Sequence, residues 1–341
     1  MPEHALLAPV ERPAAAATAQ GPRPLRGAAV LSVGASLPTR SVTNAEVAER
    51  IGKTDDWIYT RTGIRERRHA GPDERLVDVA AAAGRAALER AGVTAAELDL
   101  ILVATLTPDD LMPSTAAALA NELGASRAGA LDVNAACSGF ISALALGAAQ
   151  VESGRAERVL VVGADFISRI TDHDSKQTAM LFADGAGAVV VAPVAGPGRI
   201  GPVLLHADAS EPEYLWASRD ERIIRMDGHA TFKYAVIHMV DVTLEAIEAA
   251  GLTLGDIDLF VYHQANGRIL KSISERLALD PAKVVDCIEL TGNMSAASVP
   301  HALEAARVDG RLRDGARVLM AAFGGGFTWG GGVIEWGSGN D

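Results

Sequence analysis

Short apolar runs alternate with Ala-rich stretches along this 341-residue chain, and the alternation predicts strands and helices in turn. Runs of Val, Leu, Ile and Ala bounded by Gly or charged residues are typical of buried strands. They predict strands at 98–103, 159–162 and 186–191. The Ala-rich segments have helical spacing and end at Gly92 and Gly251, as helices stopped by glycine do. Strands that alternate with helices predict an α/β fold with mainly parallel sheets.

The chain also contains an internal repeat. Residues 89–103 resemble residues 248–262 after an ungapped shift of 159 positions. The same shift pairs Asn134 with Asn293, residues 143–144 with 302–303, and residues 158–160 with 317–319. Several matches in one register indicate a duplication, so we expect two related halves, 27–200 and 201–341. Their buried helices should pack between two sheets, and strand ends from both halves should meet at one cleft.

Cys137 stands where an apolar strand should end and an apolar helix should begin. No charged residue occurs between Val133 and Val151, which is typical of a helix that is buried all round. A thiol at the start of a helix faces the positive end of the helix dipole, which favours the thiolate. Cys137 is therefore a candidate nucleophile at the bottom of a pocket. The alternative is a packed core cysteine, the commoner fate of an isolated cysteine in an apolar segment.

His263 is a second candidate, because it directly follows the apolar run 257–262. The repeat places Ala104 at the equivalent position of the first half. A polar residue that departs from its repeat mate at the end of a strand is a functional candidate. A histidine bonded locally in a turn is the alternative.

Asn293 is a third candidate, and we expect it to end a strand within the segment 289–298. Its repeat mate is Asn134, so an Asx turn or a helix cap is an alternative to a chemical role. The glycine-rich segment 323–330 lacks the Gly-Lys-Ser/Thr of a phosphate loop. Its exposed backbone N–H groups could instead hold an oxyanion.

Composition and charge narrow the class of protein. The chain is 49% hydrophobic and 22% charged, as in ordinary globular proteins, and its net charge of −12 argues against non-specific binding to nucleic acid or to an anionic membrane. No apolar run is long enough to span a membrane. The two cysteines, Cys137 and Cys287, form no disulfide framework, which favours a reducing cytoplasm. The Ala- and Pro-rich segment 1–26 is predicted to be a flexible extension and looks like neither a secretory signal nor a transit peptide.

Several motifs now add to the Cys137 segment. They lie at 57–67, 182–187, 262–266, 292–297 and 323–330. Together they resemble the β-ketoacyl-[acyl-carrier-protein] synthase III family of the thiolase-like superfamily, over about residues 27–337. His-Gln-Ala-Asn and Gly-Gly-Gly-Phe-Thr-Trp-Gly are the most specific of these signals. The resemblance implies a five-layer αβαβα fold, built from two duplicated halves, in a homodimer.

The resemblance also implies a Cys-His-Asn site made of Cys137, His263 and Asn293. The Cys137 thiolate would attack the thioester of an acyl-CoA primer and form an acyl-enzyme. Malonyl-acyl-carrier-protein would then lose CO₂, with His263 and Asn293 donating hydrogen bonds to the enolate, and yield a β-ketoacyl product for fatty acid or polyketide initiation. The backbone N–H groups of Cys137 and Gly325 would hold the tetrahedral oxyanion. The reaction implies no metal and no cofactor, because acyl-CoA is a substrate.

Other residues of this chain match positions at which the family binds its substrates. Trp57, Arg61 and Lys176 match the positions that bind the CoA adenine. Arg268, Lys233 and Arg276 match basic positions that dock the carrier protein. Met112 matches a position that crosses the dimer to the acyl pocket, and Lys176 stands where the family often has a flat, stacking Arg. Residues that depart from the family beside the catalytic pair, and are expected to reshape the pocket wall, are Gly267, Met294 and Tyr262.

Three alternatives remain. Papain-like peptidases share the chain order Cys, His, Asn, but the local signature around their cysteine is missing here. A thiolase would need a second cysteine in a glycine-rich turn, whereas Cys287 lies in an apolar stretch and is predicted to be core. An acyltransferase of the same fold could pass the acyl group from Cys137 to an alcohol, an amine or a carrier thiol without condensation. It would not need Asn293, so the presence of Asn293 favours condensation.

Overall fold

The computed structural model describes residues 26–337. The predicted flexible extension, 1–26, therefore lies outside the described residues except for Arg26. The Arg26 guanidinium donates hydrogen bonds to the carbonyls of Val151 and Ala156 and pairs with Glu157 at 2.8 Å. Arg26 thus belongs to the folded body rather than to the extension.

Within residues 26–337, the larger of two main sheets has the strand order β1-β7-β6-β4-β5. Its strands are β1 (Gly27–Ser36), β7 (Asp184–Val194), β6 (Val159–Phe166), β4 (Leu100–Ala104) and β5 (Gly129–Val133). β6, β4 and β5 run parallel, whereas β7 is antiparallel to both of its neighbours. The three predicted strands of this half are confirmed, but the expectation of mainly parallel pairing is wrong at β7.

The second main sheet has the order β11-β12-β13-β8. Its strands are β11 (Leu259–Tyr262), β12 (Arg317–Gly324), β13 (Thr328–Glu335) and β8 (Leu204–Ala207). Only β11 and β12 run parallel, because β12 returns directly into β13 through a short turn that reverses the chain. The position of a fifth strand is marked by a parallel bridge between Phe260 and Val284.

Both sheets keep the same pairing register, which supports the duplication. Leu102 of β4 pairs with Val161 of β6, and Val261 of β11 pairs with Met320 of β12. Each residue of the second pair follows its mate in the first pair by 159 positions. The shift seen in the sequence is therefore a shift between equivalent positions in space.

The segments that follow these strands obey the same shift. The 3-10 turns η2 (Ala136–Ser138) and η7 (Ser295–Ala297) are 159 positions apart. So are the first residues of the helices that continue from them, α5 (Gly139–Glu152) and α9 (Ser298–Val308). The two turns also pack against each other, so the equivalent turns of the two halves meet at the centre of the molecule.

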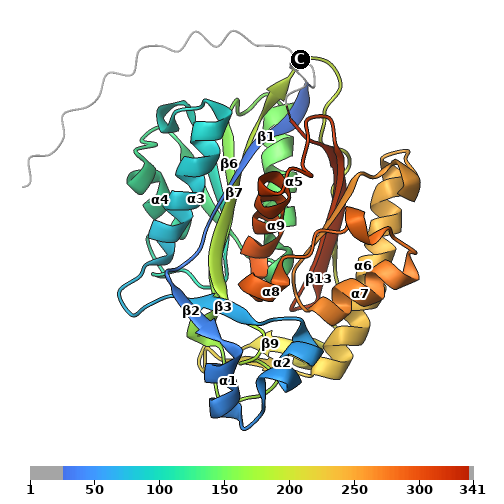
Figure 1. Ribbon diagram of the computed structural model, residues 1–341. Helices are drawn as coiled ribbons and strands as arrows, with labels where there is room; N and C mark the ends of the chain where they lie inside the picture. Colours follow the sequence, from blue (N-terminus) through green and yellow to red (C-terminus); the bar gives the residue numbers. More distant parts are fainter. Residues whose placement is uncertain (1–25, 338–341) are drawn as a thin grey trace, which may run out of the picture.

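The helices complete five layers (Figure 1). On the outer side of the first sheet lie α3 (Leu76–Ala91) and α4 (Thr115–Leu123), and on the outer side of the second lie α6 (Gly228–Ala249) and α7 (Gly267–Arg276). Helices α5 and α9 lie between the sheets and contact strands of both. The predicted αβαβα architecture is thus confirmed.

Glycines stop the outer helices as predicted. α3 ends at Ala91 and is followed by Gly92 at φ 64°, and α6 ends at Ala249, two residues before Gly251 at φ 69°. A left-handed residue at a helix end suits glycine because it has no Cβ to clash with the backbone.

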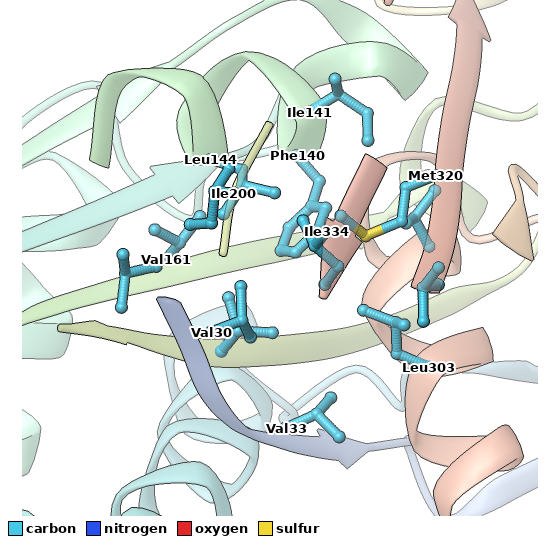
Figure 2. Close-up of a cluster of buried hydrophobic side chains, with 14 of the residues drawn as sticks. Val30, Val33, Phe140, Ile141, Leu144, Val161, Ile200, Leu303, Met320 and Ile334 are labelled. Atoms are coloured by element: carbon cyan, nitrogen blue, oxygen red, sulfur yellow. The ribbon is translucent and has the colours of Figure 1, made fainter. Parts of the chain in front are cut away.

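The main hydrophobic cluster joins both sheets to the two central helices (Figure 2). It includes Val30 and Val161 from the first sheet, Phe140 and Leu144 from α5, Leu303 from α9, and Met320 and Ile334 from the second sheet. Because helices cover both faces of each sheet, the strands are apolar on both faces instead of alternating.

The remaining elements lie together at one end of the molecule (Figure 1). They are α1 (Asn44–Ile51), α2 (Asp55–Thr62), α8 (Ile288–Thr291), β2 (Arg40–Thr43) paired with β3 (Glu66–His69), and β9 (Leu215–Ala217) paired with β10 (Ile224–Met226). No helix within residues 26–337 has the length and apolar character that crossing a bilayer demands.

Candidate active site

A cavity of about 440 Å³ brings the three predicted catalytic side chains together. Cys137, His263 and Asn293 all line it. Much of the remaining wall is apolar and consists of Met180, Leu181, Phe182, Leu215, Met226, Phe232, Ile269 and Phe323. Cys137 follows β5 and His263 follows β11, so the ends of strands from both halves meet here, as the duplication predicts. An apolar cavity with a few convergent polar groups is the usual form of a small-molecule site.

The position of Cys137 depends on a close approach of two backbones. β5 ends at Val133, and Cys137 lies in η2 immediately before the long helix α5. Gly324, the last residue of β12, lies so near that a Cβ on it would be 2.7 Å from the backbone nitrogen of Cys137. Real Cβ atoms do not come this close to backbone, so glycine is required at 324 for the second sheet to reach the nucleophile.

The electrostatic environment of Cys137 differs from the one predicted. Burial raises the pKa of the thiol to about 12, and the charge of Asp165 adds to this increase. The Ser295 hydroxyl and the backbone N–H of Cys137 itself lower the pKa, but by less. The expected thiolate at the helix dipole is therefore wrong for the resting site. Loss of solvation outweighs the dipole, and Cys137 is a neutral thiol at neutral pH.

His263 is held at the end of β11 by backbone and side-chain contacts. Its N–H donates to the carbonyl of Ala321 at 2.9 Å, and its Nδ1 contacts the hydroxyl of the fully buried Ser298. Burial lowers the pKa of His263 to about 3, so the imidazole is neutral at physiological pH. When the Ser298 hydroxyl donates to Nδ1, the ring proton is on Nε2.

Sequence reasoning missed Ser298, although the repeat contains a signal for it. The repeat mates of His263 and Ser298 are Ala104 and Gly139. In the first half these two residues pack so tightly that a Cβ on Gly139 would lie 3.1 Å from the Cβ of Ala104. The second half therefore replaces an Ala–Gly contact with a His–Ser contact, and comparing repeat mates at every position would have identified the pair.

Asn293 does not end a strand, so that prediction is wrong. The preceding residues form the short helix α8, and Asn293 makes an isolated parallel bridge with Phe182. Its N–H donates to Leu181 at 2.9 Å, and its carbonyl accepts from Ala183 at 2.8 Å. These backbone bonds fix Asn293 against the wall of the cavity.

The amide of Asn293 has a defined orientation. Its Oδ1 accepts from the N–H of Ser295 at 2.9 Å, and its Nδ2 donates to the carbonyl of Ala265 at 3.4 Å. Since the oxygen is held by a backbone donor, the NH₂ group must point the other way. An NH₂ group carries two hydrogens, and one bond to Ala265 leaves the second for a ligand.

Gly325 follows Gly324 in the turn between β12 and β13. Its N–H donates to no acceptor among residues 26–337, and a Cβ on it would lie 3.0 Å from the carbonyl of Leu215. Gly325 does not line the cavity, but it follows Gly324, which approaches the backbone of Cys137. An unoccupied backbone donor close to the nucleophile is what an oxyanion site requires. The pairing of Gly325 with the N–H of Cys137 in such a site stays a prediction.

Comparison with known proteins identifies the family. Residues 131–209 match the 3-oxoacyl-[acyl-carrier-protein (ACP)] synthase III family, and residues 247–336 match its C-terminal domain. The β-ketoacyl-[acyl-carrier-protein] synthase III of Sinorhizobium medicae (strain WSM419) is 43% identical over 318 residues, which cover 90% of this chain and 98% of that protein. This chain belongs to the β-ketoacyl-[acyl-carrier-protein] synthase III family.

Solved structures agree with this assignment. The 3-oxoacyl-[acyl-carrier-protein] synthase III from Aquifex aeolicus VF5 superposes with a TM-score of 0.88 at 40% identity, covering 91% of this chain and all of that one (100%). The priming β-ketosynthase from the R1128 polyketide biosynthetic pathway gives a TM-score of 0.89 at 41% identity, covering 92% and 98%. The family and the thiolase-like fold expected from the sequence are both confirmed.

Two of the predicted CoA-binding residues lie together on α2. Arg61 lines the cavity, and its guanidinium lies 4.2 Å from the ring centroid of Trp57. Lys53 also approaches this ring, with its ammonium 5.4 Å from the centroid. Lys176 is exposed and does not line the cavity. The structure therefore brings Arg61 and Trp57 to the same rim but leaves Lys176 apart from the cavity wall.

The predicted docking residues are divided in the same way. Arg268 lines the cavity at the start of α7, and its guanidinium carbon lies 5.8 Å from the ring centroid of Phe232. Lys233 and Arg276 lie on α6 and in the last turn of α7. Neither lines the cavity. Met112 is 84% exposed and also lies outside the cavity wall.

The residues that depart from the family, Gly267, Met294 and Tyr262, lie behind the cavity wall, so their expected effect on its shape stays a prediction. None of the residues in question lines it. Met294 and Tyr262 are buried, and the Tyr262 hydroxyl lies 3.3 Å from that of Thr243. Gly267 lets the start of α7 approach α2, since a Cβ on it would lie 3.1 Å from the carbonyl of Thr62. These residues act on packing behind the wall.

Proposed function

We propose that this chain condenses an acyl-CoA primer with malonyl-acyl-carrier-protein through an acyl group carried on Cys137. The observation that carries the proposal is one apolar cavity lined by a thiol, a neutral imidazole and an oriented carboxamide, supplied by Cys137, His263 and Asn293. The product is a β-ketoacyl-acyl-carrier-protein, which begins a fatty acid or a polyketide.

In the first half-reaction, Cys137 attacks the thioester carbonyl of the primer. The carbonyl oxygen becomes an oxyanion, and the backbone N–H groups of Cys137 and Gly325 donate to it. CoA then leaves and an acyl-cysteine remains, so the enzyme follows ping-pong kinetics. Because the pKa of the buried thiol is about 12, the proton must depart as the sulfur attacks.

In the second half-reaction, the malonyl thioester loses CO₂ and becomes an enolate. Its oxygen needs hydrogen-bond donors, and His263 and Asn293 supply two: Nε2–H of the neutral ring and the free Nδ2–H of the amide. A neutral donor suits this task, since burial that lowers the pKa of His263 to about 3 keeps the ring from becoming an acid that would protonate the carbanion. The enolate carbon then attacks the acyl-cysteine.

Binding of the substrates follows from the charges around the cavity. Arg61 and Trp57 hold the CoA adenine end together with Lys176, and Arg268, Lys233 and Arg276 dock the acidic carrier protein. The chain acts as a cytoplasmic homodimer in which Met112 reaches the acyl pocket of the partner. It uses no metal and no cofactor, and binds neither nucleic acid nor membrane.

The test is intact-mass analysis after mixing with a panel of acyl-CoAs. One acyl adduct is expected, lost in Cys137→Ala and retained in Cys287→Ala, which removes the other, half-buried cysteine. An adduct that persists in Cys137→Ala would move the nucleophile elsewhere. Addition of malonyl-acyl-carrier-protein should then give a β-ketoacyl product. Transfer of the acyl group to an alcohol, an amine or a carrier thiol without CO₂ release would identify the rival acyltransferase.

A further inference from the structure

The two halves differ at three neighbouring positions around the nucleophile. Cys137 has Ala296 as its repeat mate. Two polar residues that act on the pKa of its thiol depart in the same way: Ser295 has Ala136 as its mate, and Asp165 has Gly324. The backbone follows the duplication here, so the three residues and their three mates occupy equivalent places on opposite sides of the pseudo-twofold axis. One side carries a thiol, a hydroxyl and a carboxyl, and the other carries only alanine and glycine.

Asp165 is a fully buried carboxyl at the end of β6. Its Oδ1 accepts from the hydroxyls of Thr105 and Thr107, at 3.0 and 2.9 Å, and from the N–H of Leu106 at 2.9 Å. Its Oδ2 accepts only the longer bond, 3.3 Å, from the N–H of Ala296. One oxygen is thus anchored, while the other lies beside η7 with capacity for a further partner.

Ser295 lies in η7 between this carboxyl and the thiol. Its hydroxyl is buried and, among residues 26–337, meets no partner in hydrogen-bonding geometry. The N–H of the next residue, Ala296, donates to Asp165 Oδ2, which holds Ser295 beside the carboxyl. Burial raises the pKa of both the Cys137 thiol and the Asp165 carboxyl, and the Ser295 hydroxyl partly offsets that increase in each. η7 packs against both η2 and β6, which carry these two groups. A buried hydroxyl with no fixed partner is unusual, and this one can turn to donate to one neighbour while accepting from the other.

The established groups of the site do not account for the thiol proton. A thiol with a pKa of about 12 needs an acceptor as it attacks. His263 is a weak one, because its pKa is about 3 and its Nδ1 is engaged by Ser298. The negative charge of Asp165 opposes a nearby thiolate unless the carboxylate takes up the proton. If the proton moves from the thiol to the carboxylate, only one of the two groups is charged at any time, and the repulsion does not arise.

We propose that the Ser295 hydroxyl relays the proton of Cys137 to the carboxylate of Asp165 during acylation and returns it during condensation. This inference rests on the proposed function of Cys137. In this relay Ser295 exchanges a proton directly with the reacting sulfur and is a catalytic residue, whereas Asp165 acts through Ser295 as a positioning residue.

The proton balance closes over one cycle. As the C–S bond to Cys137 forms, Sγ gives its proton to Ser295 Oγ, which passes its own proton to Asp165. CoA leaves as a thiolate and takes a proton from solvent. When the enolate carbon attacks the acyl-cysteine, Cys137 leaves as a thiolate and recovers the proton of Asp165 through Ser295. The net reaction consumes one proton and releases CO₂ and CoA.

The relay makes a distinctive prediction about pH. A thiol that ionises by losing its proton to solvent becomes about tenfold more reactive per pH unit below its pKa. A thiol that passes its proton to Asp165 has the same number of bound protons before and after transfer, so its reactivity is constant between the two pKa values. The charge of Asp165 acts on the thiol. The other titratable or charged residues that line the same cavity are His263, His229, Arg61 and Arg268, and burial keeps His263 neutral in this range.

The experiment measures, from pH 5.5 to 9.5, the rate of Cys137 alkylation by iodoacetamide and the rate of acyl-adduct formation from acyl-CoA. The wild-type enzyme should show a pH-independent plateau in both. Ser295→Ala should lose the plateau, gain a rise of about tenfold per pH unit, and acylate about 100-fold more slowly at pH 7. Alanine is suited to this position, since its repeat mate Ala136 has the same left-handed backbone, φ 47° against 49°. Asp165→Asn should lose the plateau as well.

Ser168→Ala is the matched control. It removes the hydroxyl of a half-buried serine that donates to the buried Asp184, and should keep the plateau. A plateau retained in Ser295→Ala, or no plateau in the wild type, would overturn the relay while leaving Cys137 as nucleophile. Failure of the proposed function would be distinct, because the acyl adduct would then survive Cys137→Ala.

Discussion

Asn134 and Asn293 close the same turn in the two halves of the molecule. Asn134 Oδ1 accepts from the N–H of Ala136 at 3.3 Å, and Asn293 Oδ1 accepts from the N–H of Ser295 at 2.9 Å. The residue that donates has a left-handed backbone in both cases. The structural role expected of an Asx turn is therefore real, and the proposed role in chemistry would be an addition to it in the second half.

The two asparagines provide a matched pair of variants. Asn293→Ala should load the acyl group normally but lose about 100-fold or more in condensation, since it removes one enolate donor. Asn134→Ala removes the same turn bond but no enolate donor. For an equal drop in melting temperature, its condensation rate should therefore fall far less than that of Asn293→Ala. Single-turnover formation of β-ketoacyl product measures the difference. An equal loss of condensation rate in both variants would show that Asn293 acts only through the turn.

The pH dependence of condensation should reveal the state of His263. Burial lowers the pKa of His263 from 6.5 to about 3, so the neutral donor persists well below the usual titration of histidine. With preformed acyl-enzyme, where the thiol no longer titrates, the condensation rate should vary less than about twofold between pH 8 and pH 5. A fall with a midpoint near pH 6.5 would show that His263 titrates as an exposed histidine.

Ser298 should matter for condensation and not for loading. Ser298→Ala removes the hydroxyl that contacts Nδ1 of His263, so the ring proton is free to move between the two nitrogens. We expect kcat for condensation to fall about tenfold, because the ring loses the one hydrogen bond that orients it. The rate of acyl-adduct formation should not change. Ser298→Thr, which restores a hydroxyl, should recover part of the loss. Ser142→Ala, which removes a hydroxyl of α5 that donates to the carbonyl of Ser138 in η2, is the control and should leave both steps intact.

Gly324→Ala should disable the nucleophile by displacing it. The new Cβ would lie 2.7 Å from the backbone nitrogen of Cys137, and relief of such overpacking costs about 1–3 kcal/mol. Acylation should fall by about 100-fold, and the melting temperature should drop. Gly255→Ala is the control, because its Cβ would meet no atom nearer than the Thr253 hydroxyl at 3.7 Å. An unchanged acylation rate in Gly324→Ala would show that the backbones at 324 and 137 can move apart without impairing the nucleophile.

Arg268→Glu should separate carrier docking from primer loading. The change places a negative charge at the cavity rim, where an acidic carrier would approach, so KM for malonyl-acyl-carrier-protein should rise about tenfold or more. Acyl-adduct formation should change much less. Arg313→Glu makes the same charge change on an exposed residue outside the cavity wall and should have little effect. An equal loss of both steps in Arg268→Glu would reject the docking role.

The sequence predicted most of the architecture because the duplication is written in the apolar pattern. Strands with both faces covered form continuous apolar runs, so the segments at Leu102 and Val261 could be aligned and their common register followed. The same alignment exposed His263, where a polar residue replaces Ala104. His263 could be found without a motif because it directly follows such a strand, β11.

What the sequence did not predict depends on distances between segments. The segment before Asn293 looked like a strand, yet only its bridge to Phe182 replaces one. The thiolate expected of Cys137 was judged from the local helix, whereas desolvation by both halves determines its pKa. Asp165 lies in no motif, and Ser295 lies in the motif 292–297 without a predicted role. Their position near the thiol follows only from the packing of η7 against both η2 and β6.

The close match of η2 and η7 has a consequence for how one active site arose from two copies. Ala296 occupies the same backbone niche as Cys137, yet it is 1% exposed and lies outside the cavity. A sulfur atom installed there by Ala296→Cys would be sealed from any thioester. Ancestral symmetry thus survives in the scaffold, and access from outside determines which copy can react.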